Sequence, residues 1–188
     1  DEDLPQNASQ LRNFAVMGQG ISAQRRSLAN SAGIMLGSDY HFDLTRPGLS
    51  LYGGYQRIEM AGHIRSVVYP QASVLQVRSV PAGSPVGYNA GYVCNDETRI
   101  ATLAIGYADG YRRGFSCKGM VRFAGAELPV LGRVSMDLLI VNANAAPALQ
   151  EGDWVDVEYD LVEASRISGV GQYELLTGLG HRAERLWF

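Results

Sequence analysis

Tyrosines lie beside glycines in residues 81–113, a segment without a long apolar run. Four of the chain's tyrosines occur there: Tyr88, Tyr92, Tyr107 and Tyr111. Buried strands are built from Val, Ile and Leu, and they seldom contain glycine. Glycines beside phenols therefore indicate a bent backbone that directs hydroxyl groups towards a target. A phenol can act as a base only where positive charge or a hydrogen bond lowers its pKa from the ordinary value near ~10.

Two further segments have the sequence of anion-binding loops. Ser31 follows a predicted strand at the point where a helix should begin, and the sequence RPGL (46–49) follows a second strand. Backbone N–H groups at the start of a helix lack a partner within the helix and can bind anions. In βα barrels this position commonly binds phosphate. The alternatives are a simple helix cap for Ser31 and a surface charge for Arg46.

Two polar loops interrupt the predicted strands of the second half. Residues 106–110 (GYADG) have the composition of a turn, and Arg112 and Arg113 extend it. Residues 132–137 (GRVSMD) place polar side chains between two apolar strands. The first loop could also be a hairpin with solvated arginines. The second could be a β-bulge, a feature that also redirects side chains towards sites.

The first part of the sequence has the pattern of βα units. Apolar residues near helical spacing predict a helix over residues 7–21, and a strand at 25–29 follows it. A short helix to residue 36 and a strand at 41–44 come next. This alternation is typical of βα barrels and doubly wound sheets, but two units are too few to close a barrel.

The remainder of the sequence predicts an all-β domain, a small barrel or sandwich, with a final helix near Tyr173. The predicted strands cover residues 64–80 (broken at Pro70), 100–105, 120–123, 130–134, 138–141 and 154–157. We therefore expect a mainly β chain. A C-terminal β-barrel or sandwich domain occupies residues 56–188, and residues 1–55 are the last βα units of an incomplete (β/α)8 barrel.

Composition argues against several classes of partner. The net charge is −3 and the pI about 5.6, without a basic stripe, so no nucleic-acid partner is expected. No apolar run approaches ~18 residues and no signal-peptide pattern is present, so we expect a cytoplasmic protein that does not enter membranes. The three histidines lack metal-ligand spacing, and the two cysteines are expected to be free thiols.

Lysine is nearly absent from the sequence. Lys118 is the only lysine among 16 lysines and arginines, and the chain begins at Asp1 without methionine. We expect the chain to be a piece of a larger polypeptide, in which any lysine chemistry comes mostly from elsewhere.

In combination and in this order, the motifs resemble the C-terminal part of bacterial alanine racemases, fold-type III enzymes that depend on pyridoxal 5′-phosphate. The resemblance covers nearly the whole chain. It rests on NSA (30–32), RPGLSLYG (46–53), VGY (86–88), IGYADG (105–110), GRVSMD (132–137), YE (173–174) and the closing arginines Arg182 and Arg185.

The resemblance implies a barrel and a β domain that assemble into a head-to-tail homodimer acting on alanine. Racemisation removes the α-proton from one face and returns a proton on the opposite face, which requires two acid/base groups. In the family these are the lysine that holds the cofactor and a tyrosine of the partner subunit, which by motif is Tyr88. Tyr107 matches the tyrosine at the substrate entrance. Met136 matches the residue whose backbone N–H holds the substrate carboxylate.

The same resemblance implies the cofactor contacts. Arg46 matches the arginine that faces the pyridine nitrogen, where a permanent cation restrains side reactions. Ser31, the backbone of Gly48 and Leu49, and the hydroxyl of Tyr173 match the phosphate-binding set. The cofactor lysine has no counterpart, because Lys118 does not fit its motif. We therefore expect this polypeptide to be inactive by itself.

Two alternatives stay open at this point. Residues at the entrance set the size of the substrate side chain, so the first alternative is a racemase of another amino acid. The second is a stand-alone β-barrel interaction module without catalysis. The retained set of Ser31 and Arg46 argues against the module, which has no use for a phosphate-binding site.

Overall fold

The computed structural model describes residues 4–187, and its contacts divide the chain into two compact units. Unit 1 is Asp1–Val67 and unit 2 is Val68–Phe188. The boundary that we expect near residues 55 and 56 stays a prediction for the domains of the complete protein.

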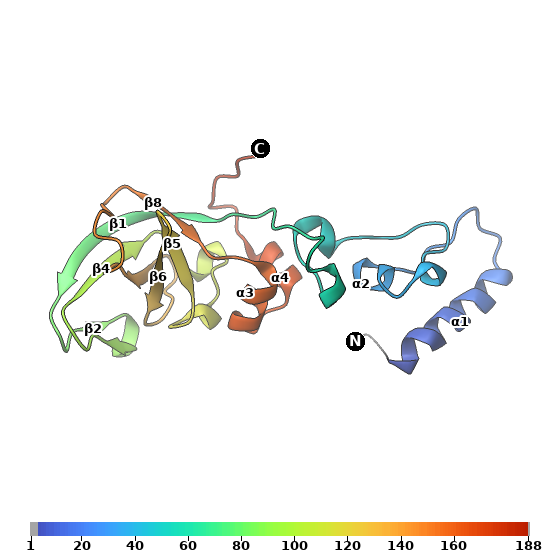
Figure 1. The fold of residues 1–188 in the computed structure, drawn as a ribbon, viewed down its shortest axis with the longest axis horizontal. Helices are drawn as coiled ribbons and strands as arrows, with labels where there is room; N and C mark the ends of the chain where they lie inside the picture. Colours follow the sequence, from blue (N-terminus) through green and yellow to red (C-terminus); the bar gives the residue numbers. More distant parts are fainter. Residues whose placement is uncertain (1–3, 188) are drawn as a thin grey trace. The chain divides into compact units, whose positions relative to one another are not determined.

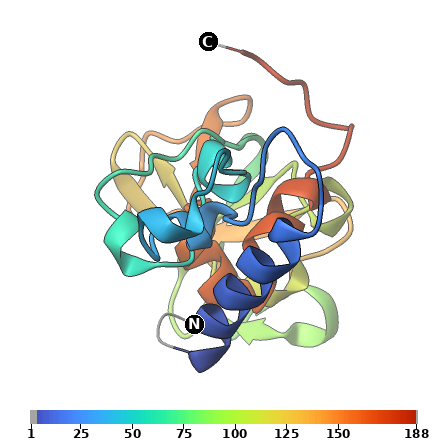
Figure 2. The same ribbon diagram turned by 90° about the vertical axis from the view of Figure 1, so that its right-hand side faces the viewer.

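Unit 1 consists of short helices joined by irregular segments. The helices are α1 (Pro5–Gln19), α2 (Ser31–Ile34) and three 3₁₀ turns, η1 (Ser38–Tyr40), η2 (Leu49–Tyr52) and η3 (Ile58–Met60). Helix α1, dark blue in Figure 2, begins with Pro5, whose missing N–H would have had no partner within the helix. None of its described residues is buried, although the ring of Phe14 packs edge-on against Phe42 at 4.9 Å.

The two strands predicted in this unit are reduced to a single parallel bridge, between Asn30 and Arg46. Backbone hydrogen bonds from Arg46 N–H to the Ala29 carbonyl (2.8 Å) and from Asp43 N–H to the Arg26 carbonyl (3.0 Å) hold the two segments side by side. Their parallel direction agrees with the βα pattern. Regular strands do not form between these segments.

Unit 2 is a closed barrel of antiparallel strands in the order β1-β4-β7-β6-β5-β8, with β8 pairing back onto β1 (Figure 1). The strands are β1 (Gln71–Val80), β4 (Thr98–Leu103), β5 (Met120–Phe123), β6 (Ala126–Leu131), β7 (Leu139–Asn142) and β8 (Trp154–Val157). The predicted mainly β chain is confirmed. A separate ladder joins β2 (Pro85–Val86) and β3 (Tyr92–Val93), which the sequence analysis missed.

Strand β1 closes the barrel because it pairs with two neighbours. Its first residues pair with β8, and its remainder pairs with β4 after a register shift between Val74 and Gln76. An irregularity of this kind bends a strand and increases its twist, which a small barrel requires. The β5–β6 hairpin turns at Ala124 and Gly125, both at positive φ (48° and 84°), as two-residue hairpins prefer.

The barrel interior holds the largest apolar cluster, with side chains from all six strands. Tyr111 stacks on Phe115 with ring centroids 4.4 Å apart, and Tyr159 lies beside Phe115. Burial raises the pKa of Tyr159 to about 12, and burial also raises the pKa of Tyr111. The Tyr159 hydroxyl donates to the Leu175 carbonyl (3.2 Å), whereas no described residue partners the buried Tyr111 hydroxyl.

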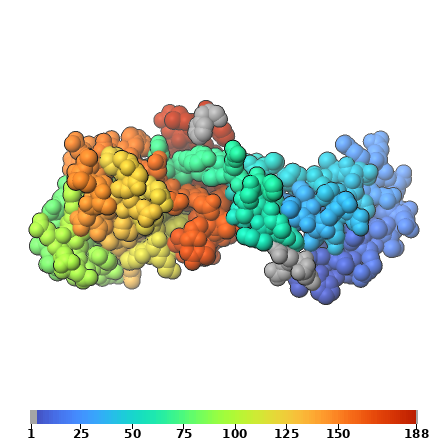
Figure 3. All heavy atoms as spheres, in the orientation of Figure 1, coloured from blue at the N-terminus to red at the C-terminus, as the bar shows by residue number. Residues whose placement is uncertain are grey.

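Helices α3 (Leu161–Ser168) and α4 (Gln172–Gly178) lie together at one end of the barrel (Figure 1). Leu161, Ala164 and Leu175 bury their side chains in the barrel cluster. Helix α3 lies outside the predicted elements. It is capped by Asp160, whose carboxylate accepts from Val162 N–H and Glu163 N–H at 3.1 and 3.0 Å. The packed atoms of this unit run from green to red in Figure 3. Both cysteines are free, as expected.

Candidate functional site

Tyr88 lies on a tight turn that projects between β2 and β3. It begins the 3₁₀ turn η4 (Tyr88–Ala90), which follows Gly87 at φ 76° and contains Asn89 at φ 57°. Glycine and asparagine adopt this left-handed backbone with the least strain. The Tyr88 side chain is 68% exposed. The glycine-rich sequence therefore produces the bent, outward-facing phenol that it predicts.

Residues 132–138 form a loop against which the Tyr88 turn packs. A Cβ atom on Gly132 would lie 2.9 Å from the Val86 carbonyl oxygen, and one on Gly87 would lie 3.3 Å from the Arg133 nitrogen. The approach of the two backbones explains why both positions, at positive φ, are glycine. The side chain of Arg133 runs past Gly91, so a cation lies beside this turn.

The same 132–138 loop also holds the turn that carries Tyr107. Tyr107 N–H donates to the Ser135 carbonyl (3.0 Å), and Ala108 N–H donates to the Met136 carbonyl (2.9 Å). Space between the loops is so small that a Cβ atom on Gly106 would overlap the Met136 carbonyl. The structure thus brings the loops of Tyr88, Tyr107 and Met136 together.

These hydrogen bonds also orient the backbone N–H of Met136. In a trans peptide the C=O of one residue and the N–H of the next point in opposite directions. Since the Ser135 carbonyl points at Tyr107 N–H, Met136 N–H points away from the Tyr107 backbone. No described residue accepts a hydrogen bond from it, and the Met136 side chain is half exposed. Met136 N–H is therefore a free donor.

A cation also lies against Tyr107. The guanidinium carbon of Arg113 is 4.8 Å from the centroid of the Tyr107 ring, within the range of a cation–π contact. The sequence motifs do not identify Arg113 and Arg133 as site residues, although both occur in the two polar loops that interrupt the strands. Tyr173 lies on the first turn of α4, half exposed, so its hydroxyl is available to a ligand.

In unit 1, Ser31 lies against the start of η2. Its hydroxyl oxygen accepts hydrogen bonds from Gly48 N–H (2.9 Å) and from Ser50 N–H (3.4 Å). The helix cap is the neighbouring Asn30, whose side chain accepts from Gly33 N–H at 2.9 Å. Ser31 is therefore not the cap of α2. Leu49, the first residue of η2, is buried, and the buried hydroxyl of Ser50 has no partner among the described residues.

Arg46 is held against the preceding parallel segment. Its guanidinium donates to the carbonyl oxygen of Ser27 (2.9 Å), the hydroxyl of Ser27 (2.6 Å) and the carbonyl of Leu28 (3.3 Å). These bonds give the side chain a fixed direction, which a freely solvated surface arginine would lack.

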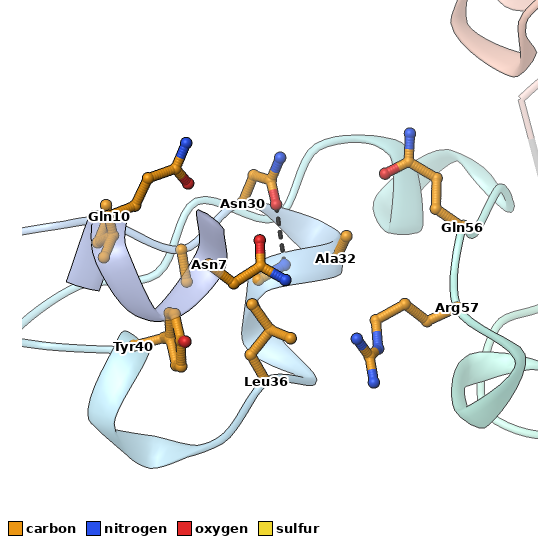
Figure 4. Close-up of a pocket in the computed structure, with 11 residues that line it drawn as sticks. Asn7, Gln10, Asn30, Ala32, Leu36, Tyr40, Gln56 and Arg57 are labelled. Atoms are coloured by element: carbon orange, nitrogen blue, oxygen red, sulfur yellow. Dashed lines mark hydrogen bonds between the residues drawn. The ribbon is translucent and has the colours of Figure 1, made fainter. Parts of the chain in front are cut away.

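A cavity of about 800 Å³ opens in unit 1 (Figure 4). Its lining includes Asn30 and Ala32, on either side of Ser31, but none of Ser31, Arg46, Gly48 and Leu49. Its other polar residues are Asn7, Gln10, Tyr40, Gln56 and Arg57. Arg57 donates to Glu59 at 2.6 Å, while its buried Nε has no partner among the described residues. No sequence motif distinguishes Gln10, Tyr40, Gln56 and Arg57.

Pyridoxal 5′-phosphate presents a phosphate that requires several converging hydrogen-bond donors. Around η2 the hydroxyls of Ser31 and Ser50 can donate to a phosphate, whereas Gly48 N–H and Ser50 N–H already donate to the Ser31 oxygen. The Ser31 oxygen accepts from the two N–H groups in the manner of a phosphate oxygen. The residues present therefore fit the phosphate of this cofactor.

Between residues 4 and 187, no group of three or more His, Cys, Asp and Glu side chains could hold a metal ion. The described helices include none that is long and apolar enough to cross a membrane.

The model of the C-terminal domain of alanine racemase matches residues 67–187, and the model of its N-terminal domain matches residues 1–56. The chain belongs to the alanine racemase family. It is 39% identical to an alanine racemase of Rhizobium meliloti, over 100% of this chain and 54% of that protein. A catabolic alanine racemase of Rhizobium johnstonii is 42% identical, over 98% of this chain and 50% of that protein.

Solved alanine racemase structures have the same fold. The crystal structure from Bartonella henselae, with covalently bound pyridoxal phosphate, is 38% identical with a TM-score of 0.86, over 100% of this chain and 54% of that one. The Streptomyces coelicolor A3(2) enzyme has a TM-score of 0.89 at 30% identity, over 99% and 52%. The chain thus spans about half the length of the alanine racemases that it matches.

Proposed function

We propose that this chain forms part of a pyridoxal 5′-phosphate-dependent alanine racemase that interconverts L- and D-alanine, with Tyr88 as one of two acid/base groups. The observation that carries the proposal is the arrangement of three loops in unit 2. Tyr88 is presented on an exposed turn, and the loop behind it joins this turn to Tyr107 and to the free N–H of Met136. A proton-transfer group, an aromatic ring and an N–H that can donate to a carboxylate suit an amino-acid substrate.

The bound cofactor would withdraw electrons from the α-carbon of alanine and so make its hydrogen acidic. Tyr88 would accept or return the proton on one face of that carbon. The opposite face requires a second group. Lys118, the only lysine, does not fit the family's motif for the cofactor lysine, which supports a second group from outside residues 1–188.

The other residues would bind and orient. Met136 N–H would hold the substrate carboxylate, and Tyr107, fixed by its backbone bond and by Arg113, would border the entrance. Ser31, Gly48, Leu49 and the Tyr173 hydroxyl would bind the cofactor phosphate. Arg46 would face the pyridine nitrogen as a permanent cation, and its bonds to Ser27 and Leu28 would keep it in place.

We further propose a head-to-tail homodimer in the cytoplasm, where the product D-alanine supplies cell-wall synthesis. In this arrangement Tyr88, Tyr107 and Met136 of one subunit would serve the cofactor bound by the other. The exposure of the Tyr88 ring supports it, because a catalytic phenol needs a partner surface that excludes water from it.

A chimaera tests the proposal. The part of the Rhizobium meliloti relative that precedes its match to this chain is fused ahead of residue 1, and racemisation is followed by chiral chromatography. We expect interconversion of alanine enantiomers that depends on added pyridoxal 5′-phosphate. The 188-residue chain alone should show no turnover and no visible absorption band with the cofactor. An inactive but folded, dimeric chimaera, or preference for another amino acid over alanine, would contradict the proposal.

A further inference from the structure

A cationic side chain from the C-terminal segment bridges the two loops that carry Tyr107 and Met136. After α4 the chain leads away from the body of unit 2 (Figures 1 and 2), and Arg182 is at the start of this segment. Its Nη1 lies 2.6 Å from Asp137 Oδ1, and its Nε lies 3.4 Å from Asp109 Oδ1. One guanidinium therefore contacts one carboxylate from each loop.

Each of the two carboxylates is next to, or close to, a proposed substrate-binding residue. Asp137 directly follows Met136, and Asp109 ends the 3₁₀ turn η5 (Tyr107–Asp109). The other oxygen of Asp109 accepts from Gly106 N–H at 2.9 Å, which closes the Tyr107 turn on itself. Asp109 thus couples Arg182 to the backbone of that turn.

The backbone of the C-terminal segment is fixed to the same turn. Gly180 N–H donates to the Asp109 carbonyl at 3.2 Å, two residues before Arg182. This bond limits how far the Arg182 backbone can move from Asp109. The planar guanidinium has donors on several sides, so it can contact two carboxylates at once.

We infer that Arg182 is a positioning residue, which holds Asp109 and Asp137 together and so sets the place of Met136 N–H relative to Tyr107. The inference rests on the proposed racemase function for its kinetic consequence, but its structural consequence belongs to this chain alone. Two backbone hydrogen bonds already join the loops at Tyr107 and Ala108. Arg182 adds a second connection at Asp109 and Asp137, the residues that follow these bonds in each loop.

The Arg182 side chain is 54% exposed, and ion pairs of this exposure seldom add much to the stability of a fold. Unit 2 is therefore expected to stay folded when Arg182 is replaced. A change in substrate binding would then report on position rather than on unfolding. Arg185 offers a matched control, because it lies in the same segment and its guanidinium contacts only the Leu179 carbonyl, at 3.3 Å, among the described residues.

The first test uses the 188-residue chain and needs no activity. Amide hydrogen exchange is measured at Tyr107 and Ala108, whose N–H groups bond to the Met136 loop. Arg182→Ala should speed exchange at both amides about two- to fivefold, because the loops separate more often, while Arg185→Ala leaves it unchanged. Equal exchange in the two variants would overturn the inference.

The second test measures alanine racemisation in the chimaera. Arg182→Ala should raise KM for alanine roughly tenfold and leave kcat within about twofold. The reason is that Met136 N–H, which binds the substrate carboxylate, is misplaced, whereas Tyr88 is not. Arg182→Lys should recover part of the loss, because an ammonium can pair with one carboxylate. Adding Asp137→Asn to Arg182→Ala should cause no further rise.

The two tests separate the failure of this inference from the failure of the proposed function. If the unmutated chimaera does not racemise alanine, the proposed function fails, and the exchange experiment still decides the inference. If the chimaera is active and Arg182→Ala has the same KM as Arg185→Ala, the positioning role is wrong. A similar loss in kcat and in kcat/KM, with unchanged KM, would also overturn it.

Discussion

The backbone N–H of Gly48 donates a hydrogen bond to the hydroxyl oxygen of Ser31 at 2.9 Å, across 17 positions of the sequence. Ser31 is buried, and its oxygen also accepts from Ser50 N–H. The serine hydroxyl therefore links the start of α2 to the start of η2, which are the two segments proposed to bind the cofactor phosphate.

Replacement of Ser31 by alanine should weaken this link. Two backbone N–H groups lose their acceptor, which costs about 1–3 kcal/mol of local stability when the donors stay buried. Amide exchange at Gly48 and Ser50 should accelerate, and the active chimaera should require more pyridoxal 5′-phosphate for half-maximal activity. For stability alone the control is Ser50→Ala, which removes an unpartnered buried hydroxyl and should cause no loss of stability.

Tyr88→Phe should abolish most activity of the chimaera without unfolding it. A group that transfers the proton contributes about 10²–10⁴-fold to the rate, and the exposed hydroxyl contributes little to stability. The kcat is measured beside the melting temperature. Tyr92→Phe removes a hydroxyl from the same turn region and should keep nearly full activity. A Tyr88→Phe variant with unreduced kcat would exclude Tyr88 as the base.

Gly106→Ala should destabilise unit 2 because a Cβ atom there would overlap the Met136 carbonyl. Overpacking of this kind costs about 1–3 kcal/mol, since the Tyr107 and Met136 loops must separate. Thermal unfolding of the 188-residue chain measures the loss. Gly171→Ala is the matched control, because no atom lies within 4 Å of its Cβ position. Equal melting temperatures for the two variants would show that the loops are not in close contact.

Alkaline pH should destabilise the barrel through its buried phenols. Burial raises the pKa of Tyr159 to about 12 and also raises that of Tyr111, so the folded chain keeps protons that the unfolded chain loses near pH ~10. The free energy of unfolding therefore falls as pH rises above ~10, by about 1.4 kcal/mol per pH unit for each phenol. Urea unfolding at several pH values measures this slope.

Phenylalanine variants separate the two phenols. Tyr111→Phe and Tyr159→Phe should each reduce the fall of the free energy of unfolding above pH ~10 by about 1.4 kcal/mol per pH unit, the contribution of one phenol. At neutral pH Tyr159→Phe should lower the free energy of unfolding by about 1 kcal/mol, because the hydrogen bond from Tyr159 to the Leu175 carbonyl disappears. Tyr111→Phe should be neutral or stabilising, since its hydroxyl has no partner among the described residues. An unchanged slope in both variants would refute the assignment.

The barrel could be predicted from local patterns, and its irregular parts could not. β5 (Met120–Phe123) and β8 (Trp154–Val157) have the predicted bounds, because apolar residues between turn residues identify a short strand. Helix α3 was missed although Asp160 and Glu163 form a cap signal that could have identified it. The strands expected at 25–29 and 41–44 depend on neighbours in a larger sheet, which a local pattern does not include.

The candidate site shows the same division. The glycines around Tyr88 predict its exposed turn, because a left-handed backbone favours glycine and asparagine wherever it occurs. The contacts of Ser31 with Gly48 and of Arg182 with Asp137 join residues 17 and 45 positions apart. Hydrogen bonds between such distant residues leave no periodicity in the sequence, so only the folded backbone reveals them.

The closed barrel has a consequence for recombination between related genes. Tyr88, Tyr107, Met136 and Arg182 all belong to unit 2, after the short stretch 57–66 that separates the two family-model matches. A single crossover in that stretch would transfer Tyr88, Tyr107 and Met136 together with Arg182 and the two carboxylates that it contacts. A crossover inside the barrel would instead join strands and loops from different parents, and the fit between Gly106 and the Met136 carbonyl would have to be selected again.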